Sequence, residues 1–509
     1  MIAPRLPRLF LAMMAVAAAS GVVLAVLRIA SLLPADGVPF QGYTSGDEQA
    51  SLYAVWRWVQ GLPVHTSRFE PPFNGVFFNW LFYVLYGSLT GAVLKAAALP
   101  DAWLPTVARV ITMVGAGLAG LAAYGAMTAT GVVDGRRRRI AAVLAVLLAC
   151  GPLMGYWLVT VRPDVWALAL EIVAAGLFLR LFPRRPLAAV AVAALFCYLA
   201  WAFKQANVAT LGGIGLFLLA RRNWRGVLLL PALMAALWGA TLALGSPQYV
   251  KSVLFAGFPL FYELSSLVRT LGNMGVKTLG LWGAATAILA ALAADRRVRI
   301  ALWRDDGVAL GLCGSLVALG VMGLASLQTG AGENYFFSLA FHLALTTVAG
   351  MAVLGEVAER WYVRAAAAGA AGWAAVAVAT GLALGGVVGT TDLRYMHTAF
   401  TAWKACLDPM PRPVFVDNVY MSLPWMTPAT EPFVLSFLYR VERDMGKPFA
   451  GDGIGGLVAR GHFATIAVPA PEAPAAIDSA NLDGYGVAKS CQGLQVLLRR
   501  DLMKGEGSP

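Results

Sequence analysis

The stretch LFLAMMAVAAASGVVLAVLRIASLL, residues 9–33, holds one charged side chain in 25 positions. A helix needs about 20 such residues to cross the ~30 Å hydrocarbon core of a membrane. Apolar runs of this kind recur to about residue 388, and 59% of the 509 residues are hydrophobic while 13% are charged. So little charge cannot cover the surface of a soluble globule of this length. The sequence therefore predicts an all-α polytopic membrane protein.

The first run also has features of a secretory signal. Arg5 and Arg8 precede it, and small residues around Ser20 resemble a cleavage site. The run nevertheless continues to Leu33, which is longer than a signal core, and many further runs follow. We therefore expect an uncleaved first span.

Apolar runs predict eleven spans in all. They lie at residues 9–33, 105–130, 140–158, 164–182, 187–203, 206–220, 226–245, 276–294, 307–326, 335–355 and 366–389. A twelfth run, residues 73–98, is ambiguous on its hydropathy alone.

The distribution of basic residues decides the twelfth run. If residues 73–98 do not cross, the loops on one side carry 18 arginines, and those on the other carry nine Lys or Arg residues spread over more chain. Cytoplasmic loops are enriched in Lys and Arg, so we expect a membrane-associated helix within an external loop, residues 34–104. The N-terminus is then cytoplasmic. The net charge of +12 thus comes from basic loops that contact membrane lipids, and it does not require a nucleic-acid partner.

After the last predicted span the chain changes character. Charged residues and Pro become common, and short runs at 413–416, 463–468 and 494–498 are typical of strands. We therefore expect two domains: a transmembrane domain at residues 1–390, and a small α/β domain at residues 391–509 in the outer compartment.

The five cysteines divide between these domains. Cys150, Cys197 and Cys313 lie in predicted spans, where a packing role is the default. Cys406 and Cys491 both lie in the external domain, where they either form a disulfide or remain free thiols. With four His in the chain and no Cys or His pair at zinc-site spacing, we expect no structural zinc.

Polar residues gather at the outer ends of the predicted spans. They are Asp47, Glu48, His65, Arg68 and Glu70 in the first outer loop, Arg162 and Asp164 in a tight turn, Lys204 and Gln205 in another, and Gln328, Glu333, Asn334 and Tyr335 in a later one. Ionisable groups at a membrane boundary are costly unless they are solvated or paired, so this asymmetry predicts a polar site that opens outward.

Each of these groups also has a structural interpretation. Acids at the start of a predicted helix at 47–60 suit the helix dipole. Arg162 and Asp164 could form a simple ion pair across their turn. Lys204 could extend to the membrane surface, and Glu333 could solvate a turn.

Three motifs of the first loop are GDEQASLY at 46–53, QGLPVH at 60–65 and EPPF at 70–73. This loop resembles the first external loop of GT-C superfamily glycosyltransferases of the protein-mannosyltransferase and aminoarabinose-transferase type. The likeness continues through RPD at 162–164, FKQ at 203–205 and ENY at 333–335, and so covers about residues 40–350. Glu70 and His65 depart from the usual residues, which affects the expected sugar and acceptor more than the reaction type.

The resemblance implies inverting sugar transfer from a polyprenyl-phosphate-linked donor to an envelope glycan, a lipid or a protein at the outer face. Asp47 matches the family's catalytic Asp and is expected to act as general base, a role worth about 10²–10⁴ in rate. Glu48 is expected to orient the acceptor or to assist.

Other outer-face residues are expected to bind the donor. Arg162, Lys204 and Arg269 would hold the departing lipid phosphate. Asp164, Gln205, Glu333 and Asn334 would bind sugar hydroxyls or fix these cations. Some superfamily members use a divalent metal at paired acids, and the residues here do not require one.

Three other functions are compatible with the sequence. A transporter or flippase of lipid-linked sugars would need polar residues deep within the spans, where Glu171 is the main example. A lipopolysaccharide ligase or polymerase would concentrate its site in one large later loop, whereas the loop at 246–274 is modest. An inactive relative is the third. The Ala- and Arg-rich composition is typical of a high-GC bacterium, so we expect its inner membrane.

Overall fold

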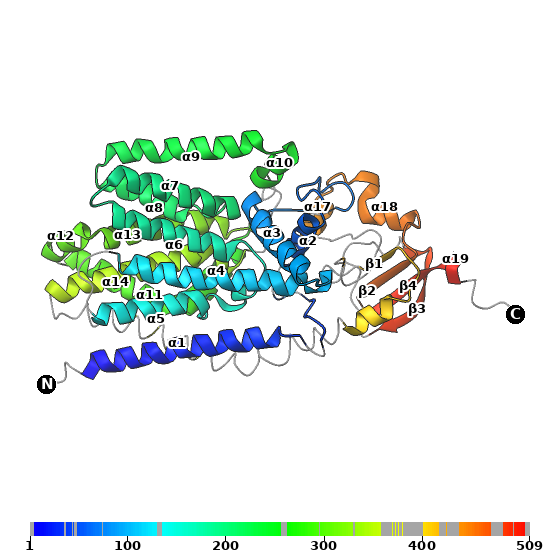
Figure 1. Cartoon of the computed structure of the whole chain (residues 1–509), viewed down its shortest axis with the longest axis horizontal. Coiled ribbons are helices and arrows are strands. Elements are labelled where there is room, and N and C mark those ends of the chain that lie inside the picture. Colours follow the sequence, from blue (N-terminus) through cyan, green and yellow to red (C-terminus); the bar gives the residue numbers. More distant parts are fainter. Residues whose placement is uncertain are drawn as a thin grey trace.

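The computed structural model describes most of the chain. The described residues are 5–34, 37–42, 44, 48–73, 75–129, 135–255, 262–294, 296–328, 331–357, 401–416, 437–469, 482–491 and 493–503, with positions 369, 372, 375, 379 and 424. They form a helical bundle and a small sheet domain (Figure 1). The predicted span at 366–389 falls almost entirely outside the described residues.

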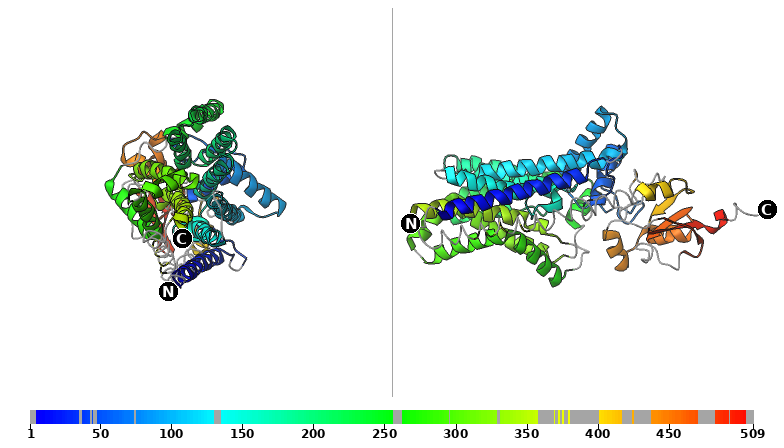
Figure 2. Two further views of the ribbon diagram at one scale, coloured as in Figure 1. Left: turned by 90° about the vertical axis from the view of Figure 1, so that its left-hand side faces the viewer. Right: turned by 90° about the horizontal axis from the view of Figure 1, so that it is seen from below.

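The long helices of the bundle run roughly side by side (Figures 1 and 2). They are α1 (Arg5–Ser31), α4 (Leu104–Met127), α5 (Gly135–Cys150), α6 (Asp164–Leu181), α7 (Pro186–Phe203), α8 (Ala209–Ala220), α9 (Trp224–Leu244), α11 (Leu264–Ala294), α13 (Asp306–Ala325) and α14 (Phe337–Val357). α1 begins at one end of the bundle. The other end, which we call the domain end, carries α2 (Glu48–Val59), α3 (Trp80–Ala96), α10 (Pro247–Phe255) and the sheet.

Four helical segments among the described residues are long and apolar enough to cross a membrane. They are Asp101–Met127, Pro186–Phe203, Trp224–Leu244 and Asp306–Ala325. Only 11% of the apolar window of α9 is buried within the protein, so most of its side chains are left to face lipid. The chain is therefore a multi-pass membrane protein, and the number of eleven crossings stays a prediction.

Helix contacts inside the bundle depend on small residues. A Cβ atom at Gly213 of α8 would lie 2.7 Å from the Cα atom of Gly314 on α13. A Cβ atom at Gly314 would lie 2.3 Å from the ring of His342 on α14. Small residues let membrane helices approach closely, so these glycines set the spacing of α8, α13 and α14.

Several predicted boundaries differ from the structure. The span predicted at 140–158 ends at Cys150, because Gly151 and Pro152 follow and do not continue the helix. The span predicted at 206–220 begins at Ala209 and rises only about 18 Å, less than the ~30 Å core. The loop predicted at 246–274 contains α10 and the start of α11, which is kinked at Thr278.

The predicted membrane-associated helix is present as α3, with a later start. Asn79 caps it by accepting a hydrogen bond from the backbone N–H of Trp80. Residue 73 and residues 75–79 are non-helical, and Phe73 has a φ of 56°. α3 lies across the end of the bundle rather than along it (Figure 2).

The C-terminal domain contains a four-stranded mixed sheet. The strands are β1 (Val414–Val416), β2 (Thr465–Pro469), β3 (Tyr485–Cys491) and β4 (Leu494–Arg499), with helices α17 (Phe437–Asp444), α18 (Gly453–Ala459) and α19 (Arg500–Met503). Their order is β1-β2-β4-β3, with β1 parallel to β2 and the other pairs antiparallel. The three predicted strands are confirmed, and β3 is an addition. Cys406 and Cys491 form a disulfide with their Cα atoms 6.5 Å apart.

This domain packs directly on the first external loop. The side chain of Arg68 forms an ion pair with buried Glu442 on α17 at 2.7 Å. The ring of Phe73 packs against those of Tyr439 and Phe449, at centroid distances of 5.7 and 5.9 Å, and these two rings lie 4.6 Å apart. The backbone N–H of Ala450 donates to the carbonyl of Phe69 at 2.8 Å. The external loop and the C-terminal domain therefore share one core.

Candidate functional site

The sequence-predicted polar residues meet at the domain end of the bundle. α2, the turn at residues 160–164, the turn between α7 and α8, and the short helix η3 (Glu333–Phe336) contribute them. They form two neighbouring clusters, which we name after their central acids: the Glu48 cluster and the Asp164 cluster.

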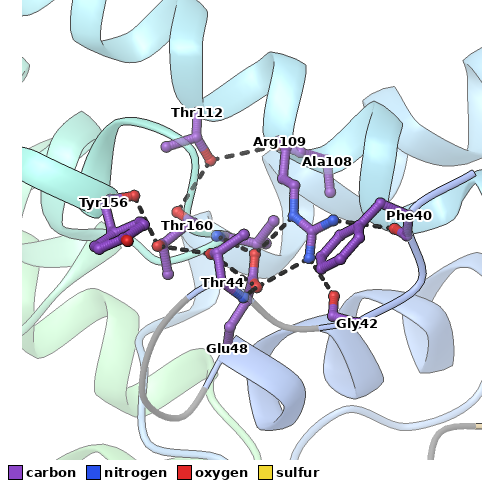
Figure 3. Close-up of polar contacts among 10 residues, drawn as sticks. Phe40, Gly42, Thr44, Glu48, Ala108, Arg109, Thr112, Tyr156 and Thr160 are labelled. Carbon is purple, nitrogen blue, oxygen red and sulfur yellow. Dashed lines mark hydrogen bonds and ion pairs between the residues drawn. The ribbon is translucent and has the colours of Figure 1, made fainter. Parts of the chain in front are cut away.

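The Glu48 carboxylate is completely buried at the start of α2 (Figure 3). Its Oε1 atom accepts from Arg109 Nε at 3.1 Å and from the backbone N–H of Val161 at 2.9 Å. Its Oε2 atom accepts from Arg109 Nη2 at 3.0 Å, and from the backbone N–H and hydroxyl of Thr44 at 2.6 and 3.0 Å. The two carboxylate oxygens together therefore have partners on three separate segments of the chain.

Arg109, one turn inside α4, completes this cluster. Its guanidinium also donates to the carbonyls of Phe40, at 3.1 Å, and Gly42 (Figure 3). Arg109 is 1% exposed and Glu48 is 0% exposed, so this is a buried, bidentate ion pair. It fastens the start of the first external loop to α4.

Threonines extend the Glu48 cluster toward the next turn. The hydroxyls of Thr44 and Thr160 lie 2.8 Å apart, and Thr160 also donates to the carbonyl of Tyr156 at 2.8 Å. The hydroxyl of Thr112 on α4 lies 3.3 Å from the carbonyl of Thr160. These hydrogen bonds hold the turn at 160–164 next to the start of the first external loop (Figure 3).

Glu48 was expected to orient the acceptor or to assist. Its carboxylate is buried and fully engaged by Arg109, Thr44 and Val161. Asp47, the expected general base, lies outside the described residues. Arg109 was not among the predicted site residues. One signal could have identified it: a lone Arg in the first turn of an apolar span needs a buried partner.

The Asp164 cluster contains the predicted cations. Asp164 Oδ2 accepts from Arg162 Nε at 3.2 Å. Asp164 Oδ1 pairs with the ammonium of Lys204 and accepts from Asn334 Nδ2 at 2.6 Å. The structure therefore brings four predicted residues from three distant segments together: Arg162, Asp164, Lys204 and Asn334.

Aromatic rings surround both cations. The guanidinium carbon of Arg162 lies 4.9 Å from the ring centroid of Trp157 and 5.1 Å from that of Phe78. The ammonium of Lys204 lies 4.6 Å from the ring centroid of Tyr335. Cation–π contacts keep the charged groups in place without neutralising them. Arg162 is 15% exposed and Lys204 is 8% exposed, so some surface of each remains accessible.

The remaining predicted residues lie around this cluster. Gln205 donates to the carbonyl of Phe77 at 2.6 Å, which ties the turn after α7 to the first external loop. Glu333 forms an ion pair with Lys277 of α11. Arg269 is exposed on α11, and among the described residues no hydrogen bond or ion pair joins it to the Asp164 cluster. Lys204 does not extend to the membrane surface as its structural interpretation predicted, because it pairs with Asp164 inside the protein.

A further polar network lies deeper in the bundle. The Glu171 carboxylate, on α6, accepts from Asn207 at 3.2 Å, from the backbone N–H of Thr210 at 3.1 Å, and from the hydroxyl of Ser338. The hydroxyl of Thr210 lies 3.0 Å from Nε2 of His342. Glu171 thereby joins the N-terminus of α8 to α14, and a carboxylate at a helix N-terminus is favoured by the dipole.

The described acids of the site do not suit a divalent metal. Glu48 is paired with Arg109, Asp164 with Lys204 and Arg162, and Glu333 with Lys277. Within the described ranges, no group of three or more His, Cys, Asp or Glu side chains could hold an ion. A metal at these described acids would have to displace the cations that pair with them.

The chain was compared with known proteins. No protein-family model and no curated protein matches it. Among solved structures it is similar to the oligosaccharyltransferase of Archaeoglobus fulgidus. The TM-score is 0.44 for the apo form, at 14% identity over 79% of this chain and 58% of that one. It is 0.46 for the complex with Zn and sulfate, at 15% identity over 89% and 68%. The chain thus spans little more than half of the apo enzyme, and TM-scores below 0.5 establish no shared function.

Proposed function

We propose that the protein is an inverting membrane glycosyltransferase that moves a sugar from a polyprenyl-phosphate donor to an acceptor hydroxyl at the domain end of the bundle. The acceptor is an envelope glycan, a lipid or a protein. We place this end on the periplasmic side of a bacterial inner membrane, as the arginine distribution predicts.

In this reaction the acceptor oxygen attacks the anomeric carbon as the bond from that carbon to the lipid phosphate breaks. The acceptor proton passes to the carboxylate of Asp47, which acts as general base. The departing phosphate gains negative charge, and Lys204 and Arg162 stabilise it. Asp164 and Asn334 keep these cations in position when no donor is bound.

The observation that carries this proposal is the turn at 160–164. Its first half, Thr160 and Val161, binds the Glu48 cluster, which is adjacent in sequence to Asp47. Its second half, Arg162 and Asp164, belongs to the cation cluster. One short turn therefore couples the segment of the proposed base to the residues proposed for the leaving group, as bond exchange at a single carbon requires.

Glu48 and Arg109 take a positioning role in this proposal. Their buried ion pair fixes the start of α2, the residue that follows Asp47, against α4. A general base must lie within hydrogen-bond reach of its proton, so a fixed anchor next to it reduces the conformations that Asp47 can adopt.

The Glu171 network favours one rival function. A transporter or flippase of lipid-linked sugars would need polar groups within the bundle, and Glu171 and His342 are both buried there. Hydrogen bonds to three elements instead suit an acid that holds α8 and α14 in place. A transfer assay with purified protein distinguishes the two functions, because a flippase forms no glycosidic bond.

The test combines cells and purified protein. Deletion cells complemented with wild type, Asp47→Asn or Asp483→Asn would be analysed by mass spectrometry of envelope glycans and polyprenyl-phosphate sugars. We expect Asp47→Asn to lose one glycan residue and to accumulate its lipid-linked donor. Asp483→Asn, which changes an exposed acid of the C-terminal domain, should behave as wild type.

Purified protein in detergent should then transfer the identified sugar to the identified acceptor, with Asp47→Asn at least 10²-fold slower. Full transfer by Asp47→Asn at normal membrane levels would refute the general-base assignment. An unchanged glycan and lipid profile in the deletion cells would refute the enzyme proposal itself.

A further inference from the structure

The short helix α12 (Arg296–Arg304) has two unlike faces. It connects α11 and α13 at the end of the bundle where α1 begins, opposite the candidate site (Figure 1). Val298 and Leu302 are fully buried against the bundle. The other face is exposed, and it alternates cations with apolar groups: Arg296, Arg299, Ile300 and Trp303.

A second exposed segment lies beside the end of α12. The guanidinium of Arg221, which follows α8, lies 5.9 Å from the ring centroid of Trp303 and pairs with Asp306 at 2.8 Å. The residues after it, Arg222, Trp224 and Arg225, are all exposed, Trp224 by 61%. The two segments together form a surface that we call the α12 patch.

Two described acids beside the α12 patch are already engaged. Asp306 pairs with Arg221, and Asp305 accepts from the backbone N–H of Val308 at 3.0 Å as the N-cap of α13. Within the described part of the chain, no acid forms an ion pair with Arg296 or Arg299. Among the described side chains, Arg296 and Arg299 therefore have no acidic partner at this end of the bundle, where α9, with its lipid-facing surface, begins.

We propose that the α12 patch binds the headgroup of an anionic phospholipid of the surrounding membrane. Its arginines would contact the phosphate, while Ile300, Trp303 and Trp224 enter the boundary between headgroups and acyl chains. The orientation of a protein in the membrane depends on the positive charge of its loops. It does not require the exposed apolar and aromatic side chains that accompany the arginines here. The turn between α6 and α7 shows the contrast in sequence, because Arg184 and Arg185 are exposed and residues 181–187 contain no Trp.

Quenching of Trp303 fluorescence by brominated lipids tests the proposal. The full chain would be placed in nanodiscs that contain brominated phosphatidylglycerol or brominated phosphatidylcholine at the same mole fraction. The difference between wild type and Trp303→Phe isolates the signal of Trp303. We expect this signal to be quenched several-fold more steeply by the anionic lipid, since each arginine near the surface contributes roughly a fivefold preference.

Two paired variants locate the binding. Arg296→Gln combined with Arg299→Gln should remove most of this several-fold difference, so that the two lipids quench almost equally. Arg184→Gln combined with Arg185→Gln removes the same charge from the same end of the bundle and should leave the preference unchanged.

Three outcomes would overturn the proposal. Equal quenching by the two lipids in wild type would show no headgroup preference, and this result needs no variant. An equal loss of the lipid preference in the variant at Arg184 and Arg185 would mean that the preference depends on the total positive charge at this end of the bundle. Loss of the preference in inorganic phosphate, but not in chloride of the same ionic strength, would identify a site for soluble phosphate instead.

Discussion

Two buried acids at the same end of the bundle have unlike surroundings. Glu48 is bound by one guanidinium and by backbone and hydroxyl donors, and neither it nor Arg109 is more than 1% exposed. Asp164 is bound by two cations, each of which keeps some exposed surface and lies against an aromatic ring. The first arrangement leaves no exposed charge, whereas in the second 15% of the Arg162 side chain and 8% of the Lys204 side chain stay exposed.

Desolvation explains the difference. A buried ion pair is stable only when good geometry and additional hydrogen bonds offset the removal of both charges from water, and the Glu48 cluster meets this condition. Cations that are partly exposed keep more of their hydration and can exchange it for an anionic ligand. The first cluster is therefore expected to determine stability, and the second to determine binding.

Removal of Arg109 should have the largest effect on the free energy of unfolding. Arg109→Ala leaves the Glu48 carboxylate buried without its cation, which is expected to lower the free energy of unfolding by about 3–5 kcal/mol. Thermal unfolding in detergent and the level of protein in membranes would measure this. The double variant Glu48→Gln, Arg109→Gln should recover part of the loss, because no unpaired charge remains. A loss below about 1 kcal/mol for Arg109→Ala would contradict the role of the pair.

Removal of Lys204 should affect transfer more than stability. In Lys204→Met, Asp164 keeps Arg162 and Asn334 as partners, while the proposed phosphate contact is lost, so kcat should fall about 10²–10³-fold. The transfer assay and thermal unfolding would be compared for the same variant. Lys251→Met, at an exposed position on α10, is the control and should retain activity. Normal transfer by Lys204→Met would remove this residue from the donor site.

His65 of the first external loop should make stability depend on pH. Burial lowers the pKa of His65 to about 4, although a hydrogen bond to the carbonyl of Phe78 opposes this. The unfolded pKa is about 6.5, so the neutral ring stabilises the fold above pH 6.5, and this contribution is lost as the pH falls toward 4. We expect a loss of about 2 kcal/mol across this window.

His65→Gln removes the titrating group and provides the comparison. Thermal unfolding curves of the two proteins should differ in slope between about pH 6.5 and 4 and run parallel above it. Parallel curves throughout would show that His65 is solvated in the folded state.

Arg269 should have the smallest effect. The sequence predicts it as a phosphate ligand, yet it is exposed on α11 and, in the described ranges, has no bond to the Asp164 cluster. Arg269→Gln should therefore change kcat/KM less than about twofold, within ±0.5 kcal/mol for an exposed substitution. A tenfold loss in the transfer assay would mean that α11 contributes to the donor site.

Hydropathy alone predicts most helices of the bundle, because a long apolar run forms a helix in a membrane with little dependence on the rest of the chain. The strands at 414–416, 465–469 and 494–499 were also predictable from short β-branched and aliphatic runs. β3 was not, because it lies at the sheet edge and its sequence, YGVAKSC, mixes Gly, Lys and Ser with one β-branched residue.

The site could be predicted only as a set of residues. Outer-end positions indicated Arg162, Asp164, Lys204 and Asn334, and the structure places them in one cluster. The partner of Glu48 could not be identified, because Arg109 lies 61 residues away and pattern analysis considers one segment at a time. Contacts between distant segments depend on packing, which local periodicity does not encode.

The distances along the chain within the Glu48 cluster also have a consequence for biosynthesis. Val161, whose N–H binds this carboxylate, is 113 residues further along the chain. At a translation rate of about 5–20 residues per second, the carboxylate emerges roughly 6–20 s before its last partner. During that interval the first external loop must stay hydrated or bound by other factors. Completion of the Glu48 cluster therefore requires that the chain has been made and assembled as far as Val161.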